Sequence, residues 1–434
     1  MDMVALGLAF AAMLVLMFLS LPVAIAILSV GGIGGYMAYG MPLVSMMGGV
    51  IWGSLNNSTM LAIPLFMLLG EILLRSGIAD RMYDTLAVWL GRLPGGLLHT
   101  NIATCTLFSA TSGSSVATAA TVGTIALPAL GQRNYPIRMS LGSLAAGGTL
   151  GILIPPSVNL LVYGSLANVS VGKLFMAGVL PGLMLAACFS LYIFAAYRRK
   201  QQHDEGTELS PRERFLLLRH LVPPLVIFGV VMGSIYAGVA TPTESAALGV
   251  TVALIIVALK GKLTLSLLAT CSYLAARTTG MVVLVLVCAL LLNVTISMLG
   301  ATQAVTQWIV ELGLSHVALL LVLMAFYLLL GMFMDAMSML VLTVPIAVPV
   351  VIAVGVDPIW FGIFIVIMCE IALITPPVGM NLFVVQGVRR DGGSFSDVAW
   401  GAMPFALIML AAAALFIVWP TPVLWLPDLM SVQP

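Results

Sequence analysis

The sequence predicts an all-α polytopic membrane protein made of two inverted repeats, each with a re-entrant helical hairpin and a broken helix. Three observations support this prediction. The 434-residue chain is 61% apolar and only 8% charged, whereas water-soluble domains carry roughly 25% charged residues. Proline-containing motifs recur half a chain length apart, and the basic residues are concentrated in a central segment and absent from both ends.

Apolar stretches long enough for membrane helices recur along the chain, since a spanning helix needs about 20 such residues. In the first half they lie near 4–28, 30–50, 58–76, 138–154 and 173–197. In the second half they lie near 220–238, 242–260, 270–298, 346–374 and 400–420. The first stretch has no basic residue before it and is too long for the apolar part of a signal peptide, so we expect it to be a span.

Two motifs around paired prolines show the internal repeat. Ile154-Pro155-Pro156-Ser157-Val158-Asn159 resembles Thr375-Pro376-Pro377-Val378-Gly379-Met380-Asn381, and the numbers of the first prolines differ by 376 − 155 = 221. Ile125-Ala126-Leu127-Pro128 and Ile346-Ala347-Val348-Pro349 have the same offset, since 349 − 128 = 221. Duplicated helix breakers in an apolar chain indicate a transporter binding site. We expect helix breaks near 155–159 and 375–381.

The central polar segment determines the predicted orientation. Its basic residues are Arg198, Arg199, Lys200, Arg212, Arg214 and Arg219. The positive-inside rule places this linker, 198–219, in the cytoplasm and both termini in the periplasm. The repeats, 1–197 and 220–434, then each cross the membrane an odd number of times and lie upside down relative to each other. Many secondary transporters have this architecture.

A polar segment interrupts the apolar region near 97–130. Residues 109–121 are too rich in Ser, Thr and Gly for a lipid-facing helix. Non-helical backbone persists in hydrocarbon only where protein buries it or where it lines a cavity. We therefore expect a re-entrant hairpin with its tip at 112–115. The alternative is a close contact between helices through small residues.

The matching region near 316–345 contains an acidic residue. Since 114 + 221 = 335, Asp335 corresponds to the tip of the first hairpin. A charged side chain inside a span costs roughly 2.5–3.5 kcal/mol on insertion scales, so the first interpretation is functional, with a cation as the partner. A structural carboxylate at a helix end is the alternative.

Each proline pair is followed by polar side chains. Proline lacks an N–H group, so nearby carbonyl groups lose their helical partners. Such carbonyls, together with the oxygens of Ser157, Asn159, Thr375 and Asn381, suit a small hard cation, and half-helix N-termini suit an anion. The pattern predicts one site for Na⁺ and an organic carboxylate. Proline kinks that only bend the helices are the alternative.

Other ionisable residues have less specific interpretations. Glu244 is either a helix cap or part of an ion pathway. Glu71 and Glu370 lie in apolar spans, where structural pairing would satisfy them, and Arg277 either meets an anion or extends to the interface. The five scattered cysteines indicate neither a metal site nor disulfides. No basic face for nucleic acid and no ATP-binding or hydrolase motif is visible.

Several motifs together resemble the large membrane subunit of the tripartite ATP-independent periplasmic (TRAP) transporters. The similar segments are 63–71, 112–118, 151–157, 240–247, 331–335 and 374–381. The resemblance covers nearly the whole chain. It implies a symporter of the bacterial inner membrane, not an enzyme, which uses Na⁺ to import an organic acid such as a dicarboxylate, keto acid, sugar acid or sialic acid. It also implies an elevator mechanism, in which a domain with both hairpins slides against a scaffold.

The resemblance also implies partners and site residues. The partners are a separate small four-span membrane subunit and a soluble periplasmic substrate-binding protein. One Na⁺ site would use Ser112, Ser114, Gly151 and Ser157 or Asn159, and the other would use Asp335, Thr375, Gly379 and Met380. The substrate would contact Ser112, Ser114, Ser115, Asn159, Asp335 and Asn381. Neither hairpin tip carries a basic residue, so the identity of the acid stays open.

Three alternatives belong to other functional classes. An ion channel would need a continuous polar stripe along several helices, whereas the polar residues here gather at the breaks. An ion-coupled anion transporter without a binding protein is a second alternative. An intramembrane aspartyl protease would need two neighbouring carboxylates, and the position that corresponds to Asp335 in the first repeat is Ser114.

Overall fold

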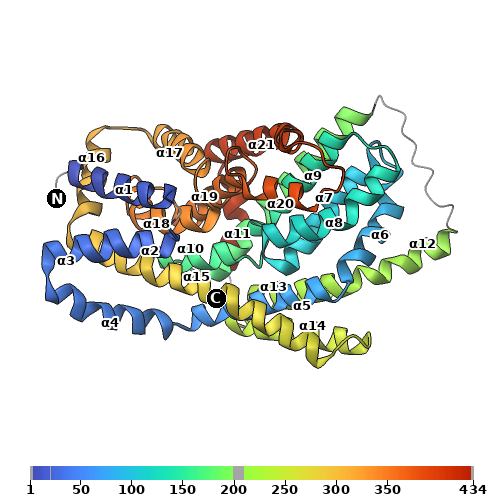
Figure 1. Cartoon of the computed structure of the whole chain (residues 1–434), viewed down its shortest axis with the longest axis horizontal. Coiled ribbons are helices and arrows are strands. Elements are labelled where there is room, and N and C mark those ends of the chain that lie inside the picture. Colours follow the sequence, from blue (N-terminus) through green and yellow to red (C-terminus); the bar gives the residue numbers. More distant parts are fainter. Residues whose placement is uncertain (1–2, 20, 199–209, 432–434) are drawn as a thin grey trace.

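The computed structural model describes residues 3–19, 21–198 and 210–431, which form helices joined by short turns and contain no strand (Figure 1). Six helices in this part are long and apolar enough to cross a membrane. The number is seven when the bent pair Pro211–His220 and Val222–Tyr236 counts as one span. The predicted all-α class is confirmed. Part of the predicted linker, 199–209, lies outside the described residues.

The first half begins with a run of short helices and ends with a long one. Its α-helices are α1 (Met3–Phe18), α2 (Val23–Leu28), α3 (Gly34–Tyr39), α4 (Met41–Leu55), α5 (Ala62–Arg75), α6 (Ile78–Leu90), α7 (Gly96–Ser112), α8 (Ser115–Gln132), α9 (Ile137–Thr149), α10 (Val158–Ala167) and α11 (Val171–Tyr197). A π-helix, Ser29–Ile33, joins α2 to α3, and 3-10 turns occupy Ser58–Leu61 and Leu150–Ile152.

The second half follows a short helix that lies within the predicted linker, α12 (Pro211–Leu217), and a 3-10 turn at Leu218–His220. Its helices are α13 (Val222–Tyr236), α14 (Pro242–Leu259), α15 (Leu265–Met298), α16 (Ala301–Glu311), α17 (His316–Gly331), α18 (Ala336–Ala353), α19 (Pro358–Leu373), α20 (Met380–Val388), α21 (Phe395–Val418) and α22 (Thr421–Ser431).

Three of the predicted spans are wrong, because they are not continuous helices in the structure. An apolar composition indicates that a segment lies in lipid or in the protein interior, but it does not show whether the helix is unbroken. The stretch 4–28 is divided at Pro22, which precedes α2 and lacks the N–H group that a continuous helix needs. The stretch 30–50 is divided at Gly40, which has φ +63°. The stretch 346–374 is divided at Asp357, whose side chain caps α19 by accepting hydrogen bonds from two backbone N–H groups.

Several helix boundaries in the second half repeat those of the first at an offset of 221 residues. The starts of α18 and α8 give 336 − 115 = 221, and those of α19 and α9 give 358 − 137 = 221. The ends of α21 and α11 give 418 − 197 = 221. A non-helical break follows both α9 with its 3-10 turn and α19. The order of elements around the breaks therefore occurs twice.

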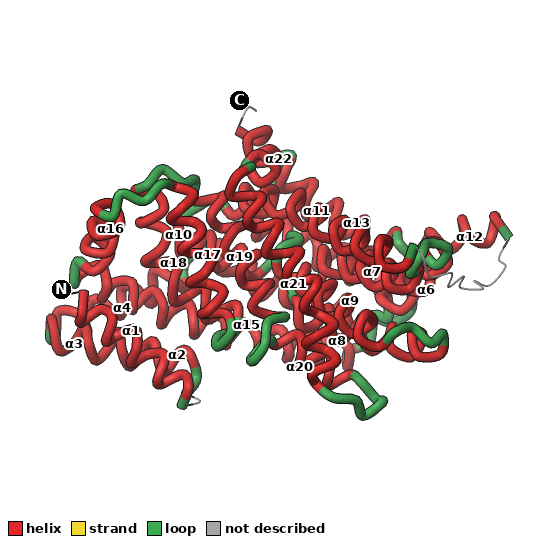
Figure 2. Tube along the Cα trace, turned by 90° about the horizontal axis from the view of Figure 1, so that it is seen from above, coloured by secondary structure: helices red, strands yellow, loops and turns green. Residues whose placement is uncertain are grey.

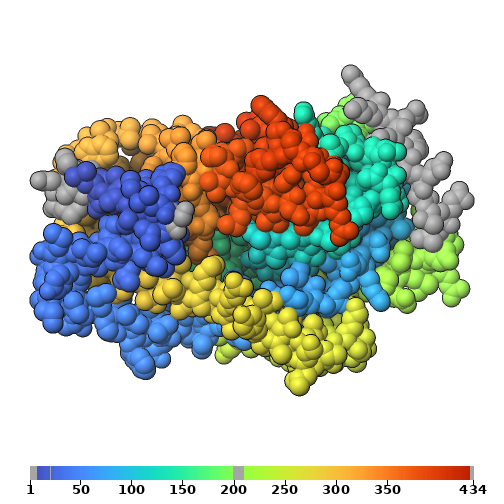
Figure 3. Space-filling model, in the orientation of Figure 1, coloured from blue at the N-terminus to red at the C-terminus, as the bar shows by residue number. Residues whose placement is uncertain are grey.

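The two halves interlock instead of lying side by side. Helix α9 packs against α21, α8 against α20, and α10 against α18 and α19, so each of these contacts joins one half to the other. The space-filling view shows the C-terminal segments lying directly on the segments that contain α8 and α9 (Figure 3). Helices α5, α13, α14 and α15 run along another side of the molecule (Figure 1).

Two glycines allow α9 and α21 to approach closely. A Cβ atom on Gly142 would lie 2.0 Å from the carbonyl oxygen of Gly401. A Cβ atom on Gly401 would lie 2.0 Å from the carbonyl oxygen of Arg138. At one end of the contact, Arg138 Nε forms an ion pair with Asp397 at 3.0 Å. Backbone therefore packs on backbone where the halves meet.

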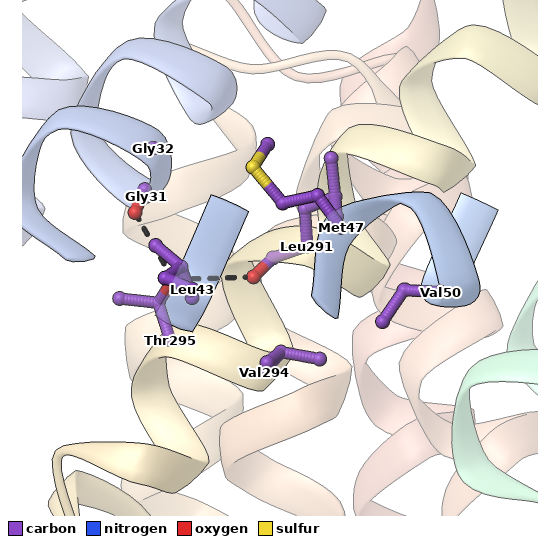
Figure 4. Close-up of a pocket in the computed structure, with 8 residues that line it drawn as sticks. All are labelled: Gly31, Gly32, Leu43, Met47, Val50, Leu291, Val294 and Thr295. Carbon is purple, nitrogen blue, oxygen red and sulfur yellow. Dashed lines mark hydrogen bonds between the residues drawn. The ribbon is translucent and has the colours of Figure 1, made fainter. Parts of the chain in front are cut away.

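The π-helix is held to α15 by a threonine (Figure 4). The Thr295 hydroxyl lies 3.0 Å from the carbonyl oxygen of Gly31 and 3.3 Å from that of Leu291. Around it, Gly31, Gly32 and Leu43 line a small apolar pocket. A Cβ atom on Gly35 would lie 2.7 Å from the Thr295 hydroxyl oxygen, so α3 also packs tightly against α15.

Candidate functional site

The first hairpin turns at Gly113, between α7 and α8. Gly113 has φ +61°, a conformation that glycine adopts without strain. Ser114 caps α8 and accepts a hydrogen bond from the Ala117 N–H group. A Cβ atom on Gly113 would lie 2.6 Å from the carbonyl oxygen of Pro156, which belongs to the first break. The tip of the first hairpin therefore lies directly against the first break.

Gly151 makes the second close approach between this tip and this break. A Cβ atom on Gly151 would lie 2.8 Å from the Ser114 carbonyl group and from the Ser115 nitrogen. The structure thus brings together Ser114, Ser115 and Gly151 from the predicted set. The Ser112 hydroxyl instead pairs with Thr118, at 3.0 Å.

The first break ends at Ser157, which caps α10. The Ser157 hydroxyl accepts from the Leu160 N–H group and donates to the carbonyl oxygen of Ile152. The next polar residue, Asn159, is buried, and its Nδ2 atom has no hydrogen-bond partner among the described residues. A buried, unused amide donor costs about 1–3 kcal/mol, so this site favours an acceptor group from a bound molecule.

Asn381 connects the second break to the first hairpin. The Ser115 hydroxyl donates to Asn381 Oδ1 at 3.2 Å, and Asn381 Nδ2 donates to the carbonyl oxygen of Ala145 at 3.3 Å. The position that corresponds to Ser115 in the second hairpin is 115 + 221 = 336, which is Ala336. The two breaks therefore differ, because Asn381 has a hydroxyl partner and Asn159 Nδ2 has none among the residues described.

The tip of the second hairpin carries Asp335 as the N-cap of α18. One carboxylate oxygen accepts hydrogen bonds from the backbone N–H groups of Met337 (3.0 Å) and Ser338 (3.3 Å), and the other accepts from the Ser338 hydroxyl. No ion pair involves Asp335 in the described part of the chain. Asp335 therefore caps α18, and within that part the carboxylate has no cationic side-chain partner.

The second break gathers three predicted residues within one turn. The Thr375 hydroxyl donates to the carbonyl oxygen of Ile371 at 2.7 Å, and the Gly379 N–H group donates to the carbonyl oxygen of Thr375 at 3.2 Å. Met380 begins α20. Among the described residues no hydrogen bond joins these three to Asp335, but the end of α17 next to the hairpin tip packs nearby, since a Cβ atom on Gly331 would lie 2.5 Å from Ala372 Cβ.

Two of the less specific acidic residues have structural roles. Glu244 forms a capping box with Thr241 at the start of α14, so its helix-cap interpretation is confirmed. Glu71 pairs with Arg75 one turn along α5, at 3.3 Å. Arg277 lies exposed on α15.

Glu370 differs from both, and its predicted structural pairing is absent from the described part of the chain. It is fully buried on α19, and neither carboxyl oxygen completes a hydrogen bond to the described residues. The backbone N–H of Leu153, in the first break, lies near it but donates to the Leu150 carbonyl oxygen at 3.3 Å. An unpaired buried carboxyl requires a proton or a cation. The signal in the sequence that could have identified it is its place in the span that leads into the second break.

The contact at Gly151 leads to a testable prediction. Gly151→Val places side-chain atoms against the backbone of Ser114, which cannot move without moving the hairpin. Overpacking costs about 1–3 kcal/mol, so we expect Gly151→Val to lower the free energy of unfolding by about that amount, as measured by thermal unfolding in detergent. Gly131→Val on α8 is the matched control, because no atom lies within 4 Å of its Cβ position. Equal melting temperatures for both variants would contradict the close contact at Gly151.

A chain with several apolar spans and two helix breaks, each packed against a helical hairpin, has the fold of a multi-pass membrane transport protein. A solved structure shares this fold. The fold is similar to the YdaH transporter of Alcanivorax borkumensis, with a TM-score of 0.63 over 88% of this chain and 89% of that one, at 15% identity.

The family follows from sequence comparison. The profile of the tripartite ATP-independent periplasmic transporter, DctM component, matches residues 10–421, and the chain belongs to this family. It is 34% identical to the C4-dicarboxylate TRAP transporter large permease protein DctM of Rhodobacter capsulatus, over 88% of this chain and 90% of the relative. It is 32% identical to the isethionate TRAP transporter permease protein DctMQ of Oleidesulfovibrio alaskensis, over 91% of this chain but 62% of that longer relative. The resemblance found in the motifs is confirmed.

Proposed function

We propose that this large TRAP permease subunit couples the inward movement of Na⁺ to the import of an organic acid anion. The observation that supports this most directly is the meeting of the first hairpin tip with both breaks. Gly113 and Gly151 join the tip to the first break, and the Ser115–Asn381 hydrogen bond joins it to the second. Irregular backbone inside an apolar protein is the usual setting for coupling ions and substrate.

In this proposal the repeats 1–197 and 220–434 are inverted relative to each other, and linker 198–219 is cytoplasmic. The offset of 221 residues shared by several corresponding helix boundaries supports the repeat. The hairpins and breaks form a transport domain, which slides as an elevator against a scaffold of α1–α5 and α13–α15. The scaffold's exposed apolar side chains support its contact with lipid and a partner, and they include Met37, Met41, Trp52, Leu259 and Leu265.

Two Na⁺ sites fit the positions of the helix breaks. The first would use Ser112, Ser114, Gly151 and Ser157 or Asn159. The second would use Asp335 and Thr375, with the backbone carbonyls of Gly379 and Met380. Na⁺ prefers oxygen ligands, and serine hydroxyls and uncommitted carbonyls supply them. Asp335 supplies negative charge to the second site, and Glu370 lies beside the first break.

The substrate carboxylate would lie between the two tips. It would contact Ser112, Ser114, Ser115, Asn159, Asp335 and Asn381, with Na⁺ bound to Asp335 so that the two negative charges do not oppose each other. The unpartnered Asn159 Nδ2 supports this placement, because an amide donor suits a carboxylate oxygen. The N-termini of α8 and α10, which begin at Ser115 and Val158, add further donors.

The chain would act in the bacterial inner membrane, with both termini periplasmic. Its partners would be a separate small four-span membrane subunit and a soluble periplasmic substrate-binding protein. The permease named DctMQ supports the first partner, because it is longer than this chain and its name joins two components.

Uptake by purified components tests the proposal. We expect proteoliposomes that contain this chain and the small subunit to accumulate an organic acid only with an inward Na⁺ gradient and the loaded binding protein. Uptake should saturate with the loaded binding protein, because transport passes through a bound state. Flux that is linear in substrate would favour a channel. Saturable uptake that needs no binding protein would favour the simpler anion transporter. Uptake that does not depend on the Na⁺ gradient would exclude the proposed coupling.

A further inference from the structure

A cleft of about 440 Å³ lies away from both hairpin tips, among α10, α15, α16 and α18. Helices α10, α16 and α18 lie at one end of the molecule (Figure 2), and the C-terminal end of α15 joins them there. The cleft residues on α18 run from Val344 to Ile352, which places them about 13–25 Å along the helix from Asp335. The cleft is therefore distinct from the proposed site at the breaks. Its volume falls within the usual range of small-molecule pockets.

The polar lining of this cleft consists of amides and hydroxyls. They are Asn168, Asn293, Ser297, Thr302 and Gln303, and no Asp, Glu, Lys or Arg of the described residues lines it. Each amide offers both donors and acceptors, as each hydroxyl does. Pro349 adds an acceptor, because its missing N–H group leaves the Pro345 carbonyl without a helical partner. Asn293 and Ser297 lie one turn apart in the mainly apolar second half of α15, where the Ser297 hydroxyl donates to Asn293 Oδ1 at 3.5 Å.

The cleft lies on the periplasmic side in the proposed orientation. From the cytoplasmic linker the chain passes outward through α13, inward through α14 and outward through α15. The end of α15, with Asn293 and Ser297, is therefore near the periplasm, and α16 follows it directly. Helices α15 and α18 belong to the proposed scaffold and transport domain, respectively. A molecule in the cleft would lie between the two bodies and on the outer side of the breaks.

We propose that this outer cleft is an entry site that binds the hydroxyl-bearing part of a hydroxylated organic acid of the sugar-acid type. The inference rests on the proposed function and specifies its substrate class. Hydroxyl groups donate and accept, as the lining does, so several can be satisfied together. A plain dicarboxylate would bring two charges to a lining that has no cation among the described residues, and it would lose hydration without compensation. A monocarboxylate with several hydroxyl groups can keep its charge towards the open mouth.

Cysteine labelling from the periplasmic side tests this entry site. Among the five cysteines only Cys188 is exposed, so Gln303→Cys is introduced in a Cys188→Ser background and co-expressed with the small subunit. A membrane-impermeant maleimide is applied with gluconate or with succinate as the probe. We expect gluconate to slow labelling roughly fivefold or more, by occupying the cleft, and succinate to leave it unchanged. The control is Val310→Cys, on the same helix and 54% exposed but outside the cleft, and neither acid should protect it.

Three outcomes would overturn the inference. These are absence of labelling at position 303, absence of protection by gluconate, and equal or stronger protection by succinate. Ser297→Cys, a conservative change at another exposed cleft position, replaces Gln303→Cys if that variant does not fold. Labelling needs no ion gradient. A wild-type chain without Na⁺-driven uptake would therefore contradict the proposed function, whereas normal uptake without protection would contradict only the entry site.

Discussion

Replacing Asp335 with Asn is expected to reduce Na⁺-driven uptake about 100-fold while leaving the fold intact. Asparagine is as good an N-cap as aspartate, so α18 should keep its capping hydrogen bonds at Met337 and Ser338. The substitution removes the negative charge and the second carboxylate oxygen, which accepts the Ser338 hydroxyl. Hydrogen bonds and contacts to a charged group contribute about 1.5–3 kcal/mol, which corresponds to roughly 10- to 100-fold in Na⁺ affinity. Uptake and thermal stability, both measured over a range of Na⁺ concentrations, check this result.

Asp335→Ala separates the two roles of the carboxylate. It removes the cap as well as the charge, so we expect a further loss of about 0.5–2 kcal/mol in stability relative to Asp335→Asn. If Asp335→Asn transported with the wild-type Na⁺ dependence, Asp335 would be a helix cap alone and the second Na⁺ site would be wrong. Comparable loss of stability in both variants would indicate that the charge also supports the fold.

Gly142→Val is expected to be the most destabilising substitution in the contact between α9 and α21. Its Cβ would lie 2.0 Å from the Gly401 carbonyl oxygen, and no flexible side chain is present there to move aside. The two helices must separate, which opens the interface between the halves of the chain. We expect a loss of about 3 kcal/mol or more, at the upper end of overpacking effects. Thermal unfolding and size-exclusion chromatography in detergent measure it.

Gly280→Val on α15 is the control for this prediction. It makes the same chemical change within a helix, but no atom lies within 4 Å of its Cβ position. A small change in its melting temperature would show that the helical propensity of valine is a minor factor. Equal melting temperatures for Gly142→Val and the wild type would show that α9 and α21 do not approach as closely as the structure indicates.

The breaks and tips can be located from the sequence because their signals are local. Proline pairs interrupt helices wherever they occur, and polar residues stand out in a chain that is 61% apolar. The prediction of spans from apolar stretches is wrong at Pro22, Gly40 and Asp357, where a helix ends inside an apolar stretch. It also misses short helices such as α10 and α16, because 10 or 11 residues cannot be recognised as spans by length.

The partners of the polar groups cannot be predicted in this way. The sequence places Asn381 at the second break, but it does not predict that the side chain bonds Ser115 and the Ala145 carbonyl group, which belong to the first half of the chain. The sequence also predicts a paired Glu370, whose carboxyl is unpaired among the described residues. Neither result follows from spacing, because each depends on how α19 and α20 pack against the first half.

The sequence by itself predicted that the chain lies in a membrane, that its motifs repeat and where its helices break. These features could be read from the sequence because composition and proline chemistry act locally. Only the tertiary structure decided that the first hairpin tip contacts both breaks and that Asn159 and Asn381 differ. The physical reason is that glycine contacts such as those at Gly113 and Gly151 place backbones within van der Waals distance across long separations in the chain. A glycine in the sequence permits such a close contact, but the packing of the helices determines which segment makes it.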